Sequence, residues 1–211
     1  MLRRYSFLIP VVPTLLILNG SMFLLQMYSN DSQLIYTLGL WPLAASSTGF
    51  LVQNVPHFQI WQLLTYAFLH GGVMHLFLNM YALWLFGSRM ESLWGPRVFA
   101  IYYFVCVIGA GIVQLIVASQ SGEIYPTIGA SGGVFGLLLA FAMTYPNERL
   151  MLIFPPVALK AKWFVLIYGL IELYFGVTGS VAGVAHFAHL GGMLFGFLLL
   201  RYWHRHPPRY Q

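Results

Sequence analysis

Apolar residues fill this chain in long runs, and the few charged residues stand between the runs. A membrane-spanning helix needs about 20 mostly apolar residues, because the hydrocarbon core is about 30 Å thick and each helical residue rises 1.5 Å. The pattern predicts six such helices, over residues 7–27, 72–87, 98–119, 128–145, 163–177 and 181–200. Glycines and prolines interrupt the charge-free stretch before residue 72, so we expect a membrane-associated loop there.

The composition supports a membrane protein over a soluble one. Of the 211 residues 59% are hydrophobic and only 7% are charged, whereas soluble domains average about 25% charged residues. The single cysteine, Cys106, excludes an intrachain disulfide and a cysteine-based zinc site. We therefore predict an all-α polytopic membrane protein with one domain over residues 1–211, ending in a short cytoplasmic tail over 201–211.

The positions of the basic residues predict an orientation in the membrane. With six helices, all 10 Lys and Arg residues fall on one side of the membrane, and such an excess is typical of the cytoplasmic side. Both termini are therefore expected in the cytoplasm. The net charge of +5 follows from this topology, and since the basic residues do not cluster on a surface, no nucleic-acid partner is expected.

Polar residues inside the predicted helices indicate function, because a polar side chain in hydrocarbon is costly. His75, Asn79, Ser131 and His189 all fall in one layer toward the outer side of the membrane. A serine hydroxyl is a weak nucleophile that needs an adjacent base, which His189 can supply. His75 and Asn79 are four residues apart, so both can point at one oxyanion, and the Ser131 backbone N–H is a third donor.

Small residues favour a close approach of the helices that carry Ser131 and His189. Gly132 and Gly136 form one stripe, and Gly192 and Gly196 form another. Each element also has a purely structural interpretation, in which the serine packs between helices and the histidine and asparagine bond neighbouring helices. Three further polar residues are interpreted separately: His70 as a cap or loop contact, His186 as structural, and Glu172 as a proton relay, a gate residue or a paired structural carboxylate.

Three strings of residues resemble the motifs of the rhomboid family of intramembrane serine proteases. They are HGGVMHLFLN over 70–79, GASG over 129–132 and AHLGGMLFG over 188–196, and the resemblance covers about residues 61–197. It implies that Ser131 is the nucleophile and His189 the general base, with His75, Asn79 and the Ser131 amide as oxyanion donors. Supporting positions in the family motifs are Phe135, Gly129, Gly132, Gly192 and Gly196. Gln62 stands where many members carry an arginine.

The resemblance implies a six-helix bundle of the bacterial type that hydrolyses peptide bonds in or near the transmembrane segment of membrane-protein substrates. No acidic motif accompanies His189, so a Ser–His dyad is expected, without metal or cofactor. The fifth helix and the loop over 178–183 are expected to act as gate and cap. A bacterial inner membrane is expected, with the site open to the periplasm. The alternatives are an inactive rhomboid-like binding or quality-control factor and a small transporter. Oligomeric state is unassigned.

Overall fold

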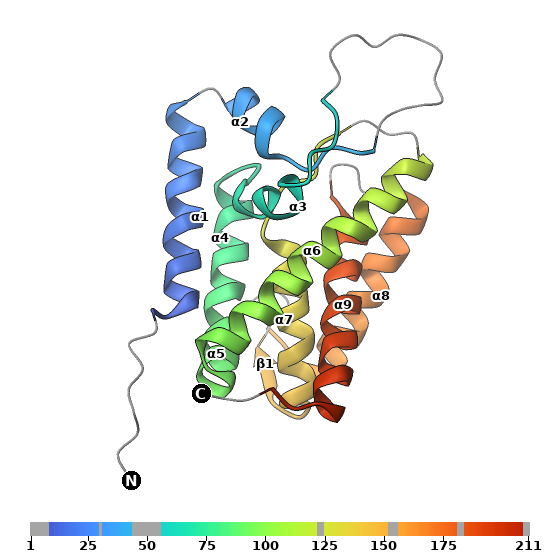
Figure 1. Cartoon of the computed structure of the whole chain (residues 1–211). Coiled ribbons are helices and arrows are strands. Elements are labelled where there is room, and N and C mark those ends of the chain that lie inside the picture. Colours follow the sequence, from blue (N-terminus) through green and yellow to red (C-terminus); the bar gives the residue numbers. More distant parts are fainter. Residues whose placement is uncertain are drawn as a thin grey trace.

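The computed structural model describes residues 9–29, 31–43, 56–121, 125–151, 156–180 and 184–208, and these form a helical bundle with one short hairpin (Figure 1). The helices are α1 (Val11–Tyr28), α2 (Asp31–Leu38), α3 (Gln62–Thr65), η1 (Tyr66–Phe68), α4 (Val73–Ala82), η2 (Leu83–Gly87), α5 (Ser88–Trp94), α6 (Pro96–Ser121), α7 (Ser131–Thr144), α8 (Ala161–Thr178) and α9 (His186–Arg205). Strands β1 (Arg149–Met151) and β2 (Ala158–Lys160) pair antiparallel.

The long helices run alternately up and down the bundle, with α6 crossing in front of α7 (Figure 1). Helix α1 begins and α9 ends at the lower end, where the hairpin also lies. Every Lys and Arg of the described residues belongs to elements at this end. This arrangement agrees with the predicted one-sided distribution of positive charge, and the membrane orientation itself stays a prediction.

Helices occupy all six ranges predicted to span, although their lengths differ. Among the described helices, α1, α6 and α8 are long and apolar enough to cross a membrane. A fourth candidate is the pair Gln62–Phe68 and Val73–Trp94, which is bent by 102°. Helix α7 is apolar but has only 14 residues. The structure therefore supports a mostly helical membrane protein with three or four candidate spans among the described residues, and six spans stay a prediction.

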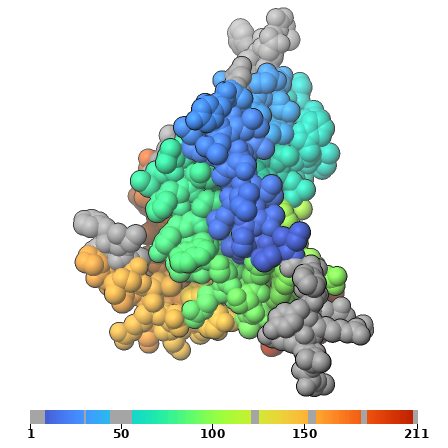
Figure 2. All heavy atoms as spheres, turned by 90° about the vertical axis from the view of Figure 1, so that its left-hand side faces the viewer, coloured from blue at the N-terminus to red at the C-terminus, as the bar shows by residue number. Residues whose placement is uncertain are grey.

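Helix α7 forms the centre of the bundle. It packs between α6, α8, α9 and the α4–α5 segment, and most of its side chains are buried. Helix α8, in contrast, lies at the periphery of the bundle: only 17% of its 18 residues are buried. Figure 2 shows α1 in blue lying across another outer face, beside the green α4–α5 segment. The apolar side chains on such peripheral helices suit contact with lipid.

Close contacts between backbones hold α7 and α9 together. A Cβ atom on Gly192 would collide with the backbone carbonyl of Gly132, and one on Gly136 would collide with Cys106 of α6. The Tyr102 hydroxyl of α6 also donates a 2.8 Å hydrogen bond to the Gly136 carbonyl. The predicted glycine stripes therefore do pack against neighbouring helices, as their spacing indicates.

The segment from α4 to α5 contains a π-helical turn, η2, which the sequence does not predict. A π-turn holds an extra residue and locally changes the direction of the side chains. The segment then ends at Gly95, with φ of 78°, and Pro96 begins α6. Glu91 of α5 also accepts backbone hydrogen bonds of 2.6 and 2.9 Å from Val11 and Val12, so it caps α1.

One predicted boundary is wrong. Helix α9 does not end at residue 200 but continues to Arg205, because Trp203 packs against Trp94 and Tyr102, with ring centroids 5.9 and 6.0 Å away. The interrupted first loop contains the short helices α2, α3 and η1. Its residues 44–55, like residues 181–183 of the predicted cap, lie outside the part described.

Gln62 has a structural role in that loop. Its side chain is buried, accepts hydrogen bonds from the backbone of Gln59 and Trp41, and donates to the Thr37 carbonyl. The glutamine therefore ties the end of α2 to α3 from within the protein.

Candidate active site

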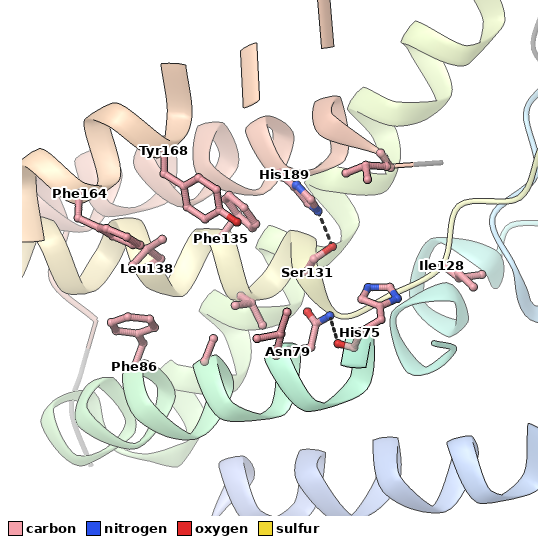
Figure 3. A pocket seen from close by; sticks show the side chains of 15 residues that line it. His75, Asn79, Phe86, Ile128, Ser131, Phe135, Leu138, Phe164, Tyr168 and His189 are labelled. Carbon is pink, nitrogen blue, oxygen red and sulfur yellow. Dashed lines mark hydrogen bonds between the residues drawn. The ribbon is translucent and has the colours of Figure 1, made fainter. Parts of the chain in front are cut away.

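Ser131 and His189 form a direct hydrogen bond. Ser131 is the first residue of α7 and His189 lies in the first turn of α9, 58 residues later. The distance from Ser131 Oγ to His189 Nε2 is 2.8 Å (Figure 3). This is the geometry in which an imidazole can remove the proton of a serine nucleophile. The close contact of Gly132 with Gly192, each near the start of its helix, makes the approach possible.

An aromatic ring covers one face of the imidazole of His189. Phe135 lies one turn after Ser131, and its ring stacks on His189 with centroids 4.2 Å apart and planes 5° apart. Tyr168 of α8 packs on the other side of Phe135 at 5.1 Å. Phe135, a supporting position in the motif, therefore packs on the histidine, whereas Tyr168 is a residue of the cavity wall that the sequence did not predict. Its position in an apolar helix gave no signal of this role.

A carboxylate binds the second ring nitrogen of His189, which corrects the expectation that no acidic group orients this histidine. Glu172 Oε2 of α8 lies 2.9 Å from His189 Nδ1 and 2.7 Å from His186 Nδ1. Since a carboxylate only accepts, both Nδ1 atoms donate to it. His189 Nε2 is then free of its own proton and accepts from the Ser131 hydroxyl. Glu172 is thus a paired carboxylate, which was one of its three interpretations.

The interpretation of His186 as purely structural is incomplete. Its ring is buried and shares Glu172 Oε2 with His189. No partner for its Nε2 atom is found among the described residues. One carboxylate oxygen therefore accepts from two imidazoles, although a single histidine adjoins the serine.

His75 and Asn79 lie on α4 across the cavity from His189 (Figure 3). The Gly71 backbone N–H donates to His75 Nδ1 over 3.3 Å, which leaves Nε2 as the N–H of a neutral ring. Asn79 is buried, and its amide nitrogen donates to the His75 carbonyl at 2.9 Å. The two predicted oxyanion donors thus line the same cavity as Ser131, but the Asn79 amide is bonded within its own helix.

Gly129 brings the chain close to His75 just before the serine. Its φ is +124°, a conformation that side-chain-bearing residues rarely adopt, and a Cβ there would lie 2.9 Å from His75 Nε2. As the first residue of α7, Ser131 has a backbone N–H without a partner inside the helix. The glycine therefore allows the serine amide and the His75 ring to approach the same space.

The proposed nucleophile, base and oxyanion donors all line one cavity of about 390 Å³. It lies between α4, α7, α8 and the start of α9, and its inner part is apolar, with Phe86, Leu138 and Phe164 (Figure 3). Ser131, His75, Asn79 and His189 supply the polar part. The cavity can hold an apolar side chain beside a polar reaction centre.

The backbone of His70 is bonded to Gln26 and holds the loop before α4 in place, and this role differs from the expected cap of α4. Its N–H donates to Gln26 Oε1 at 3.0 Å, and Gln26 Nε2 donates to its carbonyl at 3.2 Å. The His70 ring stands edge-on to His75 at 5.1 Å. Gln26 of α1 thus supports the loop before α4. Its polar side chain in an otherwise apolar helix is a signal in the sequence that could have identified this role.

Comparison with known proteins identifies the family. A family model described as Rhomboid domain matches residues 57–206. Presenilin-associated rhomboid-like protein A, mitochondrial, of Danio rerio is 33% identical over 65% of this chain. The mouse presenilin-associated rhomboid-like protein, mitochondrial, is 31% identical over 67%, and RHOMBOID-like protein 6, mitochondrial, of Arabidopsis thaliana is 27% identical over 90%.

The matched regions make up 36%, 38% and 67% of the lengths of these three relatives, so the chain spans little more than a third of the first two. Their names contain the word mitochondrial, so they do not support the expectation of a bacterial inner membrane. The matched region includes all three motif strings and the cavity between α4 and α8. This chain is an integral membrane protein that belongs to the rhomboid family.

Proposed function

We propose that this chain is a serine endopeptidase that cleaves peptide bonds in or near the membrane-spanning segment of other membrane proteins. The observation that carries the proposal is the 2.8 Å contact between Ser131 Oγ and His189 Nε2. An inactive binding factor or a transporter has no need for a serine bonded to an imidazole whose other nitrogen donates to a carboxylate.

The chemistry follows from the proton positions. His189 Nε2 takes the Ser131 proton as Oγ attacks the scissile carbonyl carbon, and the same proton then passes to the leaving amine. Glu172 keeps Nδ1 protonated and stabilises the imidazolium that forms in between. We therefore propose three acting side chains in place of the expected dyad. In the second half of the reaction His189 Nε2 takes a proton from the water that attacks the acyl-enzyme, and it returns this proton to Ser131 Oγ as the acyl group leaves.

The oxyanion of the tetrahedral intermediate needs donors that are already in place. The Ser131 backbone N–H and the His75 Nε2–H are available in the described geometry. Asn79 joins them when its amide leaves the His75 carbonyl, to which it is bonded at present. The oxyanion that forms on the substrate supplies the charge toward which that amide turns.

The substrate class follows from the walls of the cavity. Its rim is formed by α4 on one side and the peripheral helix α8 on the other, so we propose that a substrate helix enters sideways between them. A helix hides its carbonyls in internal hydrogen bonds, so the substrate has to unwind near the cut. We retain as proposals the gate role of α8, the cap over residues 178–183, six spans and a site facing away from the cytoplasm.

The experiment compares purified wild-type protein in detergent with Ser131→Ala on a single-span test substrate. Cleavage by the wild type and none by Ser131→Ala is expected, with Ser119→Ala, a serine on the exposed end of α6, cleaving normally. A fluorophosphonate probe should label wild type and Ser119→Ala but not Ser131→Ala. Cleavage by folded Ser131→Ala, or an unlabelled wild type, would overturn the proposal.

A further inference from the structure

Three side chains that can bind a metal ion converge behind the Ser131–His189 pair. Glu172 comes from α8, and His186 and His189 come from the first turn of α9. All three are buried, and one possible ligand atom from each lies within 4.8 Å of the other two. Glu172 Oε2 is already 2.7 and 2.9 Å from the two Nδ1 atoms. The proposed peptidase mechanism uses Glu172 and His189 and leaves the second histidine without a task.

We propose that Glu172, His186 and His189 form a binding site for one Zn²⁺ ion, and that the bound ion inhibits the enzyme. The binding rests on the residues alone, and the inhibition rests on the proposed function. Imidazole nitrogen and carboxylate oxygen are ordinary ligands of Zn²⁺, at about 2.0–2.2 Å. Two histidines and one glutamate leave a fourth position for water. Because the three donor atoms already face one another, small side-chain rotations suffice to surround an ion.

The charge and the access of the site suit a divalent cation. Glu172 supplies a negative charge at the point where the two ring nitrogens meet, and two neutral imidazoles complete the set. His189 also lines the 390 Å³ cavity, together with Val184 and Ala185 at the start of α9. Of the three proposed ligands His189 alone lines this cavity, so the proposed route of the ion passes this imidazole.

Inhibition follows from the proton balance on His189. In the hydrogen-bonded state Nδ1 carries the proton and Nε2 accepts from the Ser131 hydroxyl. An ion on Nδ1 replaces that proton, which moves to Nε2, so the neutral ring binds metal without releasing a proton overall. A protonated Nε2 has no lone pair for the serine proton. Zinc thus removes the general base without touching Ser131.

The test measures binding and activity on the same purified protein. A zinc-indicator titration and the absorption spectrum of bound Co²⁺ should report one site in the wild type, and Zn²⁺ should stop both cleavage and fluorophosphonate labelling. His186→Ala should weaken zinc binding roughly tenfold or more, since even neighbours of ligands contribute 10–100-fold. Its residual cleavage should resist zinc. His204→Ala, an exposed histidine near the other end of α9, serves as the matched control and should behave like wild type.

If His186→Ala fails to fold, His186→Asn tests the same ligand, because its amide still donates to Glu172 but binds zinc poorly. Equal zinc affinity and equal inhibition in the wild type and the folded His186 variant would overturn the site.

The two proposals fail separately. If the wild type cleaves but neither binds nor responds to zinc, only the proposed metal site is wrong. If the wild type binds zinc through His186 but cleaves nothing and is not labelled by the serine probe, only the proposed peptidase activity is wrong.

Discussion

Glu172 on α8 and His189 on α9 are joined by a 2.9 Å hydrogen bond between Oε2 and Nδ1. This contact connects the peripheral helix of the bundle to the first turn of the helix behind the serine. It fixes both the tautomer and the orientation of the imidazole, so a displacement of α8 changes the position of the proposed base.

Replacing Glu172 by Gln should lower kcat by about 10²-fold or more and leave KM nearly unchanged, because the amide cannot stabilise the imidazolium but fills the same space. Steady-state cleavage of a single-span substrate measures both constants. Glu148→Gln is the matched control, since Glu148 is half exposed and its 3.8 Å pair with Arg89 is worth little. A raised KM with an unchanged kcat would contradict the positioning role of Glu172.

Replacing Asn79 by Ala should reduce cleavage by about 10²–10³-fold without abolishing it, since that is the usual value of one oxyanion donor. The loss should appear in kcat, because the Asn79 amide is engaged with the His75 carbonyl until the transition state forms. Asn147→Ala, on the exposed turn after α7, should have no effect. An unchanged rate in Asn79→Ala removes this residue from the site.

Gly129→Ala should abolish cleavage, whereas Gly95→Ala should mainly lower the melting temperature. Both glycines have positive φ, +124° and +78°, so an alanine strains the backbone by an amount on the order of 1–3 kcal/mol. Only at Gly129 does the new Cβ also meet the His75 ring, at 2.8 Å from Cε1. Thermal melting in detergent with cleavage assayed on the folded fraction separates the two effects. Normal cleavage by folded Gly129→Ala would show that the contact with His75 is dispensable.

Gly192→Ala should lower the melting temperature and prevent labelling of Ser131, because its Cβ would overlap the Gly132 carbonyl and separate α7 from α9. Gly169→Ala on α8 is the control: its nearest neighbours are the flexible atoms of Met193, at 3.5 and 3.9 Å, which is ordinary contact. That variant should melt and label like the wild type. A stable, labelled Gly192→Ala would mean that the helices tolerate a wider separation.

The sequence predicts those parts of the site that depend on spacing along one helix. His75 and Asn79 share a helix face because they are four residues apart. Gly132 and Gly192 predict a close approach of two helices, because few residues other than glycine permit one. The structure places His75 and Asn79 on the wall of one cavity and brings Gly132 and Gly192 into close contact. Chain order and hydrophobic runs likewise predict the six helical ranges to within several residues.

Contacts between helices were harder to predict, because they depend on how each helix is rotated about its axis. Glu172 and His189 are 17 residues apart on two helices, and no local pattern relates them. The extension of α9 to Arg205 depends on Trp203 meeting Trp94, more than 100 residues earlier in the chain. The side chains of Gln26 and Glu91 each accept hydrogen bonds from the backbone of a distant segment, and the periodicity of the sequence does not predict such contacts.

The π-helical turn η2 has a consequence for comparing this chain with its relatives. It lies between the turn that carries Asn79 and the segment that ends at Trp94. Each residue of a regular helix turns the chain by about 100°, but a π-turn absorbs one extra residue. Deleting one residue from Leu83–Gly87 would therefore restore a regular helix and leave the segments on either side in the same relative orientation. Homologues with an unbroken helix here should therefore align only with a single-residue gap at this point. Such a gap is a trace of how the family gained or lost a residue while keeping both ends of the segment in place.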